Sequence, residues 1–290
     1  MKFRELGRTS LEVSEIGLGT EYLTHQPTDI IIDTVQTALN AGMNYIDIVF
    51  TKPSFLQALS QVIISDREKV ILACHIGAGI KDGRHRKLRS KKSARAAFEE
   101  VVKHLNVDYI DFAVVQFVTP GEYDKIMVPC GLIQFAKELK QAQVANYLGM
   151  STHHPPTALR AIESGEFDLI MTHYNIFSEK DPIRQKLFQA CTEHTIGFVA
   201  IKPFAGGLLL SNGKKIKIPA YKSGVGGKVL TIPSESTAIR YLAHILDQPA
   251  ISTVITGVKI RKELLHNLQY YSAPPEEHDY SSLIQYFSEI

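Results

Sequence analysis

Residues 42–47, with the sequence GMNYID, read as a short apolar strand that ends in the carboxylate of Asp47. The stretch continues as IVFTKP over residues 48–53, and no tyrosine follows the carboxylate there. Parallel α/β folds carry their chemistry on side chains at the carboxyl ends of strands. The stretch therefore predicts a buried strand with a functional end, whose partner residues must come from other strands.

Strand-like apolar runs alternate with segments of helical periodicity along the chain, which is typical of repeated βα units around a parallel sheet. The predicted strands are residues 15–18, 45–48, 70–75, 109–117, 145–151, 169–174, 198–203 and 253–257. The predicted helices are residues 30–41, 54–64, 93–105, 132–141, 156–164, 183–193, 236–246 and 261–270. This alternation fits a closed (β/α)8 TIM barrel better than an open sheet, because no strand is followed by a glycine-rich phosphate turn. We expect residues 1–290 to form one α/β barrel domain.

Two local signals mark the ends of elements. Residues 3–13, FRELGRTSLEV, alternate on either side of a Gly-Arg-Thr-Ser turn and predict an N-terminal β-hairpin that closes the barrel floor. Ser93 precedes an alanine-rich helical stretch and is the predicted N-cap of that helix.

Two long segments fit no βα unit. Residues 81–92, KDGRHRKLRSKK, form a dense basic loop after the third strand, on the face where barrel active sites lie. This loop either draws an anionic substrate through its local field or is simply solvated. Residues 206–234 follow the seventh strand and predict a lid, a ligand clamp or a disordered insertion. Mobility is expected at their GVGG run, residues 224–227.

The composition indicates a large globular core and no general affinity for polyanions. Hydrophobic residues make up 44%, and 32 Lys plus Arg nearly balance 30 Asp plus Glu, so the net charge of +2 gives no case for nucleic-acid binding. The distant cysteines Cys74, Cys130 and Cys191 argue against a disulfide framework, a zinc site or an iron-sulfur cluster. With neither a signal-peptide core nor an apolar run of roughly 18 residues, we expect a cytoplasmic protein that does not bind membranes. Its expected partner is a small molecule, and its oligomeric state stays open.

Several short motifs follow one another in the order found in a known family. They are FRELGRTSLEVSEIGLGT (3–20), NYID (44–47), DYID (108–111), LGMS (148–151), YN (174–175), KPFAGG (202–207) and ITG (255–257) with Asn267. This series closely resembles the aldo-keto reductases over nearly the entire chain. The resemblance implies a (β/α)8 barrel that binds NAD(P)H across its carboxyl-terminal face and uses an Asp, Tyr, Lys and His tetrad.

Most of the tetrad implied by the resemblance is replaced. The family's Asp falls on Asp47, but its Tyr, five positions later, falls on Lys52. Its Lys, at the end of the third strand, falls on His75, and its His, at the end of the fourth, falls on Gln116. In the family the Tyr gives a proton to the carbonyl oxygen while Lys and Asp lower its pKa, so the usual acid is missing.

The replacing residues suggest other chemistry. The resemblance pairs positions 47 and 75, so His75 would lie beside the Asp47 carboxylate, which orients an imidazole and raises its basicity. Lys52 would stabilise an oxyanion or act as an acid, and Gln116 would bind a hydroxyl or carbonyl group. Alternatively, Asp47 and His75 only satisfy each other as a buried pair, and Lys52 is a solvated loop residue.

The resemblance also implies a weakened nicotinamide site. Its cofactor-binding positions are Ser151, Thr152, Met171, Lys202, Gly257, Lys259, Glu263 and Asn267. The first two can still hydrogen-bond a carboxamide, but Met171 replaces the family's Gln. Glu263 stands where an Arg often binds the 2′-phosphate of NADP, so it disfavours NADP. Cations on the same turn that can still hold phosphate at a helix N-terminus are Lys259, Arg261 and Lys262. NAD or NADP is therefore the expected cofactor.

Other polar side chains are expected on the same face. His153, His154 and His173 cluster there, but a metal site needs three or four convergent ligands, and the chain has no His-x-x-x-His helix, so no metal is expected. Tyr22 and Tyr174 are alternative acids, although no pattern positions either of them.

Three functions are compatible with these residues. The first is an NAD(P)-linked oxidoreductase of a small carbonyl or hydroxyl compound that does not use the usual tetrad. The second is a non-redox lyase or isomerase with an Asp47/His75 base, which explains why several positions changed together. The third is a catalytically inactive binding barrel, because the fold alone does not determine activity.

Overall fold

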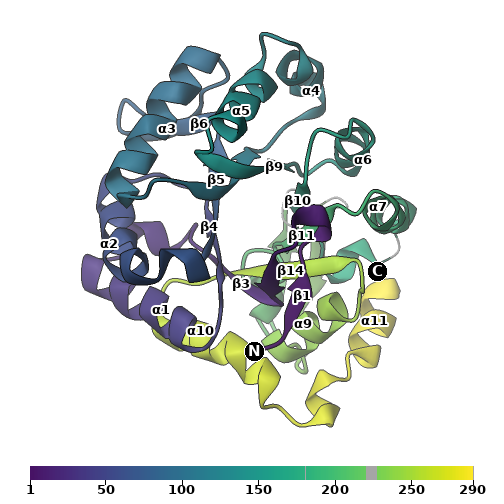
Figure 1. Ribbon diagram of the computed structural model, residues 1–290. Helices are drawn as coiled ribbons and strands as arrows, with labels where there is room; N and C mark the ends of the chain where they lie inside the picture. Colours follow the sequence, from purple (N-terminus) through teal and green to yellow (C-terminus); the bar gives the residue numbers. More distant parts are fainter. Residues whose placement is uncertain (180, 220–226, 290) are drawn as a thin grey trace.

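Eight parallel strands close into a barrel in the computed structural model, which describes residues 1–179, 181–219 and 227–289 (Figure 1). The strands are β3 (Ile16–Gly19), β4 (Tyr45–Ile48), β5 (Ile71–Ile76), β8 (Ile110–Val115), β9 (Ala145–Ser151), β10 (Leu169–His173), β11 (Gly197–Ile201) and β14 (Ile251–Gly257). Successive strands pair with one another, and β14 pairs with β3 to complete the ring. All eight predicted strands are confirmed, and the protein is a (β/α)8 TIM barrel.

Helices between successive strands surround the barrel (Figure 1). The predicted helices correspond to α1 (Thr28–Asn40), α2 (Pro53–Ile63), α3 (Lys91–Leu105), α5 (Leu132–Gln141), α6 (Pro155–Glu163), α7 (Pro182–Glu193), α9 (Ala238–Leu246) and α10 (Arg261–Leu268). Within the described residues, two further α-helices, α4 (Pro120–Met127) and α11 (Ser281–Ser288), are missing from the sequence prediction. The start of α4 carried a usable signal, because Thr119 and Glu122 form a capping box around a proline at the first turn.

The start of α3 corrects one prediction. Ser90, not Ser93, is its N-cap, and the Ser90 hydroxyl oxygen accepts a hydrogen bond from the Ser93 N–H at 3.2 Å. The two serines stand three positions apart, which is the spacing of an N-cap and the third helical residue. The helix therefore begins almost one turn earlier than predicted.

The N-terminal hairpin closes the floor of the barrel, as predicted. β1 (Phe3–Glu5) pairs antiparallel with β2 (Glu12–Ser14), and Leu6 and Val13 are fully buried against the barrel interior. The interior is filled by Tyr45, Ile71, Ala73, Phe112, Val114, Leu169, Met171, Val199 and Ile255. Because this interior is packed, polar side chains can act only at the carboxyl ends of the strands.

The predicted basic loop is a β-hairpin. β6 (Ala78–Lys81) pairs antiparallel with β7 (Arg84–Lys87) directly after β5. Asp82 and Gly83 join the two strands with positive φ angles of 53° and 70°. An Asp-Gly pair with positive φ at both residues is the favoured two-residue hairpin turn, and this signal was present in the sequence. The basic residues are therefore held on a ribbon of fixed register.

A second ribbon lies within residues 206–234. β12 (Lys215–Ile218) pairs antiparallel with β13 (Lys228–Thr231). Residues 224–226 of the glycine-rich run lie outside the described residues, so the mobility expected there stays a prediction.

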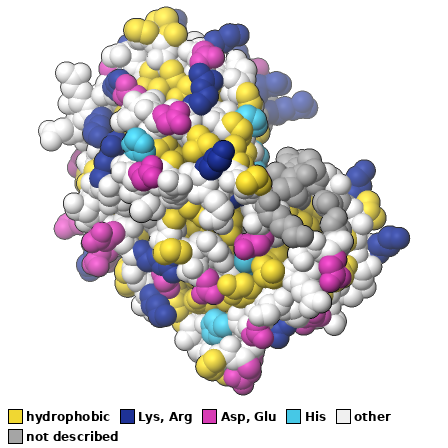
Figure 2. Space-filling view, turned by 90° about the vertical axis from the view of Figure 1, so that its right-hand side faces the viewer, with side chains coloured by type: hydrophobic (Ala, Val, Ile, Leu, Met, Phe, Trp, Pro, Cys, Tyr) yellow, Lys and Arg dark blue, Asp and Glu magenta, His cyan; other side chains and the backbone are white. Residues whose placement is uncertain are grey.

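The surface carries charges of both signs. On the face shown in Figure 2, Lys and Arg side chains are interspersed with Asp and Glu rather than gathered in one patch. None of the helices in the described part of the chain has the length and apolar character needed to cross a membrane.

We expect Gly7→Ala to destabilise the barrel floor. Gly7 has φ +56°, and an added Cβ would lie 2.2 Å from the Gly197 backbone nitrogen. Gly83 has a similar φ of +70° but open space around it, so Gly83→Ala isolates the cost of the backbone conformation. In urea denaturation, Gly83→Ala should cost about 1–2 kcal/mol and Gly7→Ala roughly 2 kcal/mol more. Equal losses of stability in the two variants would contradict the close approach between the hairpin and β11.

Candidate active site

A cavity of about 920 Å³ opens at the carboxyl ends of the barrel strands. Ten of the twelve predicted site residues line it: Asp47, His75, Gln116, Ser151, Met171, Lys202, Gly257, Lys259, Glu263 and Asn267. The predicted catalytic positions at the ends of β4, β5 and β8 thus face the same space as the cofactor positions that run from β9 to α10. One cavity brings both halves of the predicted site together.

Lys52 and Thr152 are not among the residues that line this cavity. Lys52 is exposed at the N-cap position of α2, because Pro53 starts the helix immediately after it. Thr152 is fully buried, and its hydroxyl donates to the Val118 carbonyl at 2.7 Å and accepts from the His154 N–H at 3.0 Å. The structure therefore does not support the predicted acid or oxyanion role of Lys52 or the carboxamide contact of Thr152.

His75 and Asp47 form a buried hydrogen-bonded pair in the wall of the cavity. His75 Nε2 lies 2.9 Å from Asp47 Oδ1, and 4% of each side chain is exposed. Because a carboxylate accepts, Nε2 carries the shared proton. The other ring nitrogen, Nδ1, is buried and makes no hydrogen bond to any described residue. The pair has formed as predicted, but half of the hydrogen-bonding capacity of the imidazole is unused.

Gln116 is held by two neighbours, one of which the sequence did not reveal. Its Nε2 donates to the Val49 carbonyl at 3.0 Å, and its Oε1 lies 3.0 Å from His85 Nε2. His85 belongs to β7 of the basic ribbon, and its ring packs edge-on against Phe50 at a centroid distance of 4.6 Å. The ribbon therefore brings an additional imidazole to the catalytic half of the cavity.

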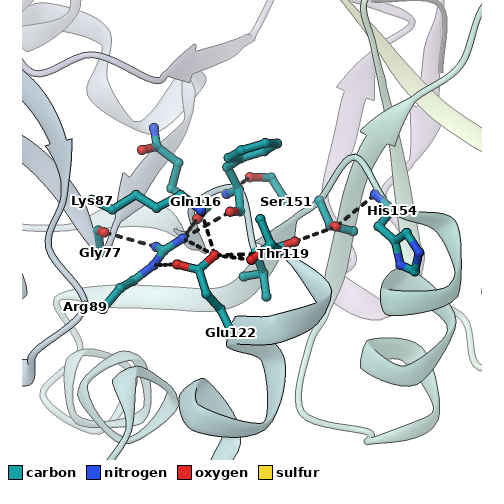
Figure 3. Close-up of polar contacts among 11 residues, drawn as sticks. Gly77, Lys87, Arg89, Gln116, Thr119, Glu122, Ser151 and His154 are labelled. Carbon is teal, nitrogen blue, oxygen red and sulfur yellow. Dashed lines mark hydrogen bonds and ion pairs between the residues drawn. The ribbon is translucent and has the colours of Figure 1, made fainter. Parts of the chain in front are cut away.

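An ion pair joins the elements on this side of the cavity (Figure 3). The Arg89 guanidinium donates to Glu122 Oε1 at 3.0 Å, to the Gly77 carbonyl at 3.0 Å and to the Gln116 carbonyl at 2.7 Å. Glu122 Oε2 also accepts from the Thr119 hydroxyl at 2.7 Å. One partly buried ion pair thus ties the segments after β5 and β8 to the start of α4. Arg89 lies in the basic run and Glu122 in the capping box of α4, but neither signal predicts that the two residues pair.

Phe117 forms a strained wall of the cavity. Its φ of 41° lies in the left-handed region, which costs a bulky residue roughly 1–3 kcal/mol. Its N–H donates to Ser151 Oγ at 2.7 Å, and its carbonyl accepts from Arg89 at 3.0 Å. Its ring lies 4.5 Å from the ring of His153 and 4.7 Å below the Lys87 ammonium. These four contacts hold the ring against the cavity in spite of the strain.

The cofactor half of the cavity ends at α10. Glu263 Oε2 accepts a hydrogen bond from the Lys259 N–H at 2.7 Å, so a carboxylate already occupies one amide of this anion-binding turn. Lys259 and Lys262 line the cavity, whereas Arg261 is paired with Asp33 of α1 at 3.3 Å. Of the three cations expected to hold phosphate, two therefore face the cavity.

Of the three histidines predicted to cluster, His153 and His173 pack edge-on with ring centroids 5.6 Å apart, and His154 has another partner. His153 lines the cavity, and burial together with the positive charges of Lys202 and Arg184 lowers its pKa to about 3, so it is neutral at pH 7. The His154 side chain caps α6, and Arg184 donates to His173 Nε2 at 2.8 Å. Among the residues that the structure describes, no three His, Cys, Asp or Glu side chains come together as a metal site.

The two alternative tyrosines differ in position. Tyr174 is buried and donates to Glu179 at 3.1 Å, and burial reinforced by that carboxylate raises the pKa of Tyr174 far above its usual value. Tyr22 does line the cavity, next to Gly257 and below the Lys259 ammonium. Tyr22 thus lies toward α10, whereas Tyr174 is not among the residues that line the cavity.

A closed (β/α)8 barrel whose cavity lies at the carboxyl ends of its strands is the architecture of the TIM-barrel enzymes. Within this class, the chain belongs to the Aldo/keto reductase family, whose family model matches residues 15–285. The resemblance seen in the sequence motifs is thereby confirmed, and with it an oxidoreductase-like function.

Known relatives extend over the whole barrel. The chain is 26% identical over 294 residues to the uncharacterized oxidoreductase YqkF of Bacillus subtilis, covering 94% of this chain and 92% of that protein. The holo form of aldo-keto reductase AKR11C1 from Bacillus halodurans superimposes with a TM-score of 0.77 at 24% identity, over 99% of this chain and 96% of that one. The putative aldo-keto reductase PA4992 from Pseudomonas aeruginosa superimposes with a TM-score of 0.70 at 21% identity. The match covers 92% of this chain and 94% of that one. These two structures support the fold.

We expect Glu122→Gln to destabilise the protein in a pH-dependent way. Burial works to raise the pKa of Glu122, but hydrogen bonds from Arg89, Lys87 and Thr119 outweigh it and hold that pKa well below its usual range. A carboxyl with a depressed folded pKa stabilises above its unfolded pKa of about 4.3, and this contribution is lost as the pH falls below that value. Urea denaturation at pH 7 should show that Glu122→Gln lowers the free energy of unfolding by roughly 2 kcal/mol.

The difference between wild type and Glu122→Gln should narrow as the pH falls from 5 to 3. Glu100→Gln removes the same charge from a side chain that is 61% exposed and should change stability little at any pH. A pH-independent gap between wild type and Glu122→Gln would contradict the role of the ion pair.

Proposed function

We propose that the protein is a nicotinamide-dependent oxidoreductase of small carbonyl or hydroxyl compounds in which the Asp47/His75 pair manages the proton. The observation that carries this proposal is the single cavity of about 920 Å³ that reaches from this pair to α10. Such a volume suits a ligand of dinucleotide size and a small substrate beside it. The cations of the β6–β7 ribbon near the mouth would favour an anionic substrate.

The lining of the cavity fits a dinucleotide. Lys202, Lys259 and Lys262 supply positive charge for a pyrophosphate, and the buried Asn267 supplies an amide at α10. Ser151, although its oxygen accepts from Phe117, still has a hydroxyl proton to donate to a carboxamide. When bound, the nicotinamide would supply or accept the hydride. Met171 offers no hydrogen bond to it, so the ring would be held less firmly than by a Gln.

The proton would be managed by His75. Asp47 fixes the ring through Nε2–H, so Nδ1 is the atom that can gain or lose a proton. In reduction, an imidazolium would give this proton to the substrate oxygen, and in oxidation a neutral ring would take the hydroxyl proton. A purely structural pair satisfies Nε2 but leaves Nδ1 buried without a partner among the described residues. Such an unsatisfied atom calls for a functional explanation, and this favours the catalytic interpretation.

The same base could serve a second function without a cofactor. Proton abstraction next to a carbonyl, as in a lyase or isomerase, needs the Asp47/His75 pair and no hydride. The unsatisfied Nδ1 favours this candidate equally, whereas the residues at α10 favour the oxidoreductase. Substrate turnover in the absence of any nicotinamide would distinguish the two.

We expect NADH to bind more tightly than NADPH by a factor of about ten or more, because a 2′-phosphate would meet the Glu263 carboxylate. Glu263→Arg should reverse the preference, and Glu263→Gln should reduce it. Quenching of nicotinamide fluorescence on titration measures both affinities. If neither NADH nor NADPH binds at millimolar concentration, the oxidoreductase proposal is wrong.

We expect His75→Ala to lower kcat by roughly 100-fold or more, because it removes the proton donor and acceptor. The affinity for NADH should stay the same. His104→Ala, on the outer helix α3, removes an imidazole without touching the cavity and should keep wild-type kcat. A steady-state assay with a panel of aldehydes, ketones and alcohols measures these values, and full activity of His75→Ala would exclude the pair from catalysis.

A further inference from the structure

The two hydrogen bonds of Gln116 determine which way its amide points. The Val49 backbone carbonyl can only accept, so the group 3.0 Å from it must be the amide nitrogen of Gln116. The amide oxygen then faces His85 Nε2 at 3.0 Å. Since that oxygen can only accept, His85 must carry its proton on Nε2. The orientation of the amide and the tautomer of the imidazole therefore fix each other.

An amide nitrogen carries two hydrogens, and Val49 takes one of them. Gln116 lines the cavity next to His75, so its second N–H is available to a ligand there. The Gln116 oxygen, in contrast, is engaged with the ribbon. With its oxygen turned to His85, Gln116 presents its amide nitrogen, a hydrogen-bond donor, to a ligand in the cavity.

We propose that His85 is a positioning residue that holds Gln116 as a hydrogen-bond donor to the oxygen of a carbonyl substrate. This inference rests on the proposed oxidoreductase function and deepens it by assigning the residue that orients the Gln116 amide toward the reacting oxygen. Negative charge develops on this oxygen during hydride transfer, and a preorganised N–H stabilises it most in that state. The donor at the end of β8 is thus set by a residue of a different element.

The ribbon is built to keep His85 in place. His85 and Lys87 stand two positions apart on β7 and therefore lie on one face of the ribbon. Lys87 donates to Glu122 Oε2 at 2.6 Å, while the His85 ring packs against Phe50. Burial, together with nearby His75, lowers the pKa of His85, so that the ring is neutral with a single tautomer at pH 7.

Kinetics of two variants at position 85 test the inference. His85→Phe keeps a ring against Phe50 but loses the donor, so the Gln116 amide can rotate, and kcat should fall about 10- to 100-fold with little change in KM. His85→Gln retains a donor and should recover most of this loss. His104→Phe makes the same exchange on the outer helix α3, away from the cavity, and as the matched control should keep wild-type values. Thermal unfolding of each variant establishes that it is folded.

A second readout does not depend on turnover. Nitrogen-15 NMR of the histidine side chains should show His85 protonated on Nε2 at neutral pH, and His85→Phe should shift the side-chain amide signals of Gln116. Protonation on Nδ1, or wild-type kcat in folded His85→Phe, would overturn the inference. If the wild type reduces no carbonyl compound with either cofactor, the oxidoreductase proposal fails by itself, and the tautomer then decides whether His85 positions Gln116.

Discussion

Closure of the ring between β14 and β3 is the constraint on which the other features depend. It buries both faces of each barrel strand and fills the interior with apolar side chains. A polar group can then meet a ligand only where a strand ends. Asp47, His75 and Gln116 stand at three successive strand ends and so face one cavity, although they are distant in sequence. Because of the same constraint, the elements that follow the strands determine the surroundings of these polar side chains, since they cover the strand ends.

The sequence predicted the barrel and most of the lining for a simple physical reason. Strand ends are local features, and the periodicity of buried strands and amphipathic helices is visible without knowledge of tertiary contacts. His85 and Arg89 were missed because their roles arise from contacts with Gln116 and Glu122 across the ribbon and α4. Lys52 matches the alternative of a solvated residue, because Pro53 starts α2 one residue later and leaves the lysine at an exposed N-cap position.

The exchanged residues form a consistent set. A carboxylate stabilises a protonated imidazole beside it in the same way as it would stabilise the ammonium of a lysine. Asp47 can therefore play the same electrostatic role when its partner is a histidine. The imidazole differs from an ammonium because it can donate at one ring nitrogen and accept at the other, so in the proposed mechanism His75 itself would transfer the proton. In the proposed mechanism a tyrosine at position 52 would then be unnecessary. Because the Gln116 amide does not titrate, proton transfer would fall to His75, and Gln116 would stabilise charge.

Strain at Phe117 indicates that the shape of this cavity is maintained at a cost. A left-handed conformation at a phenylalanine persists only where the surroundings determine it, and here Ser151 and Arg89 bind its N–H and its carbonyl. Ser151 is also a predicted cofactor ligand, so one hydroxyl oxygen links the wall of the substrate half to the cofactor half. The Arg89–Glu122 pair joins the same wall to the ribbon that carries His85. Family membership alone would not suggest these links, because Phe117, Arg89, Glu122 and His85 lie outside the shared motifs.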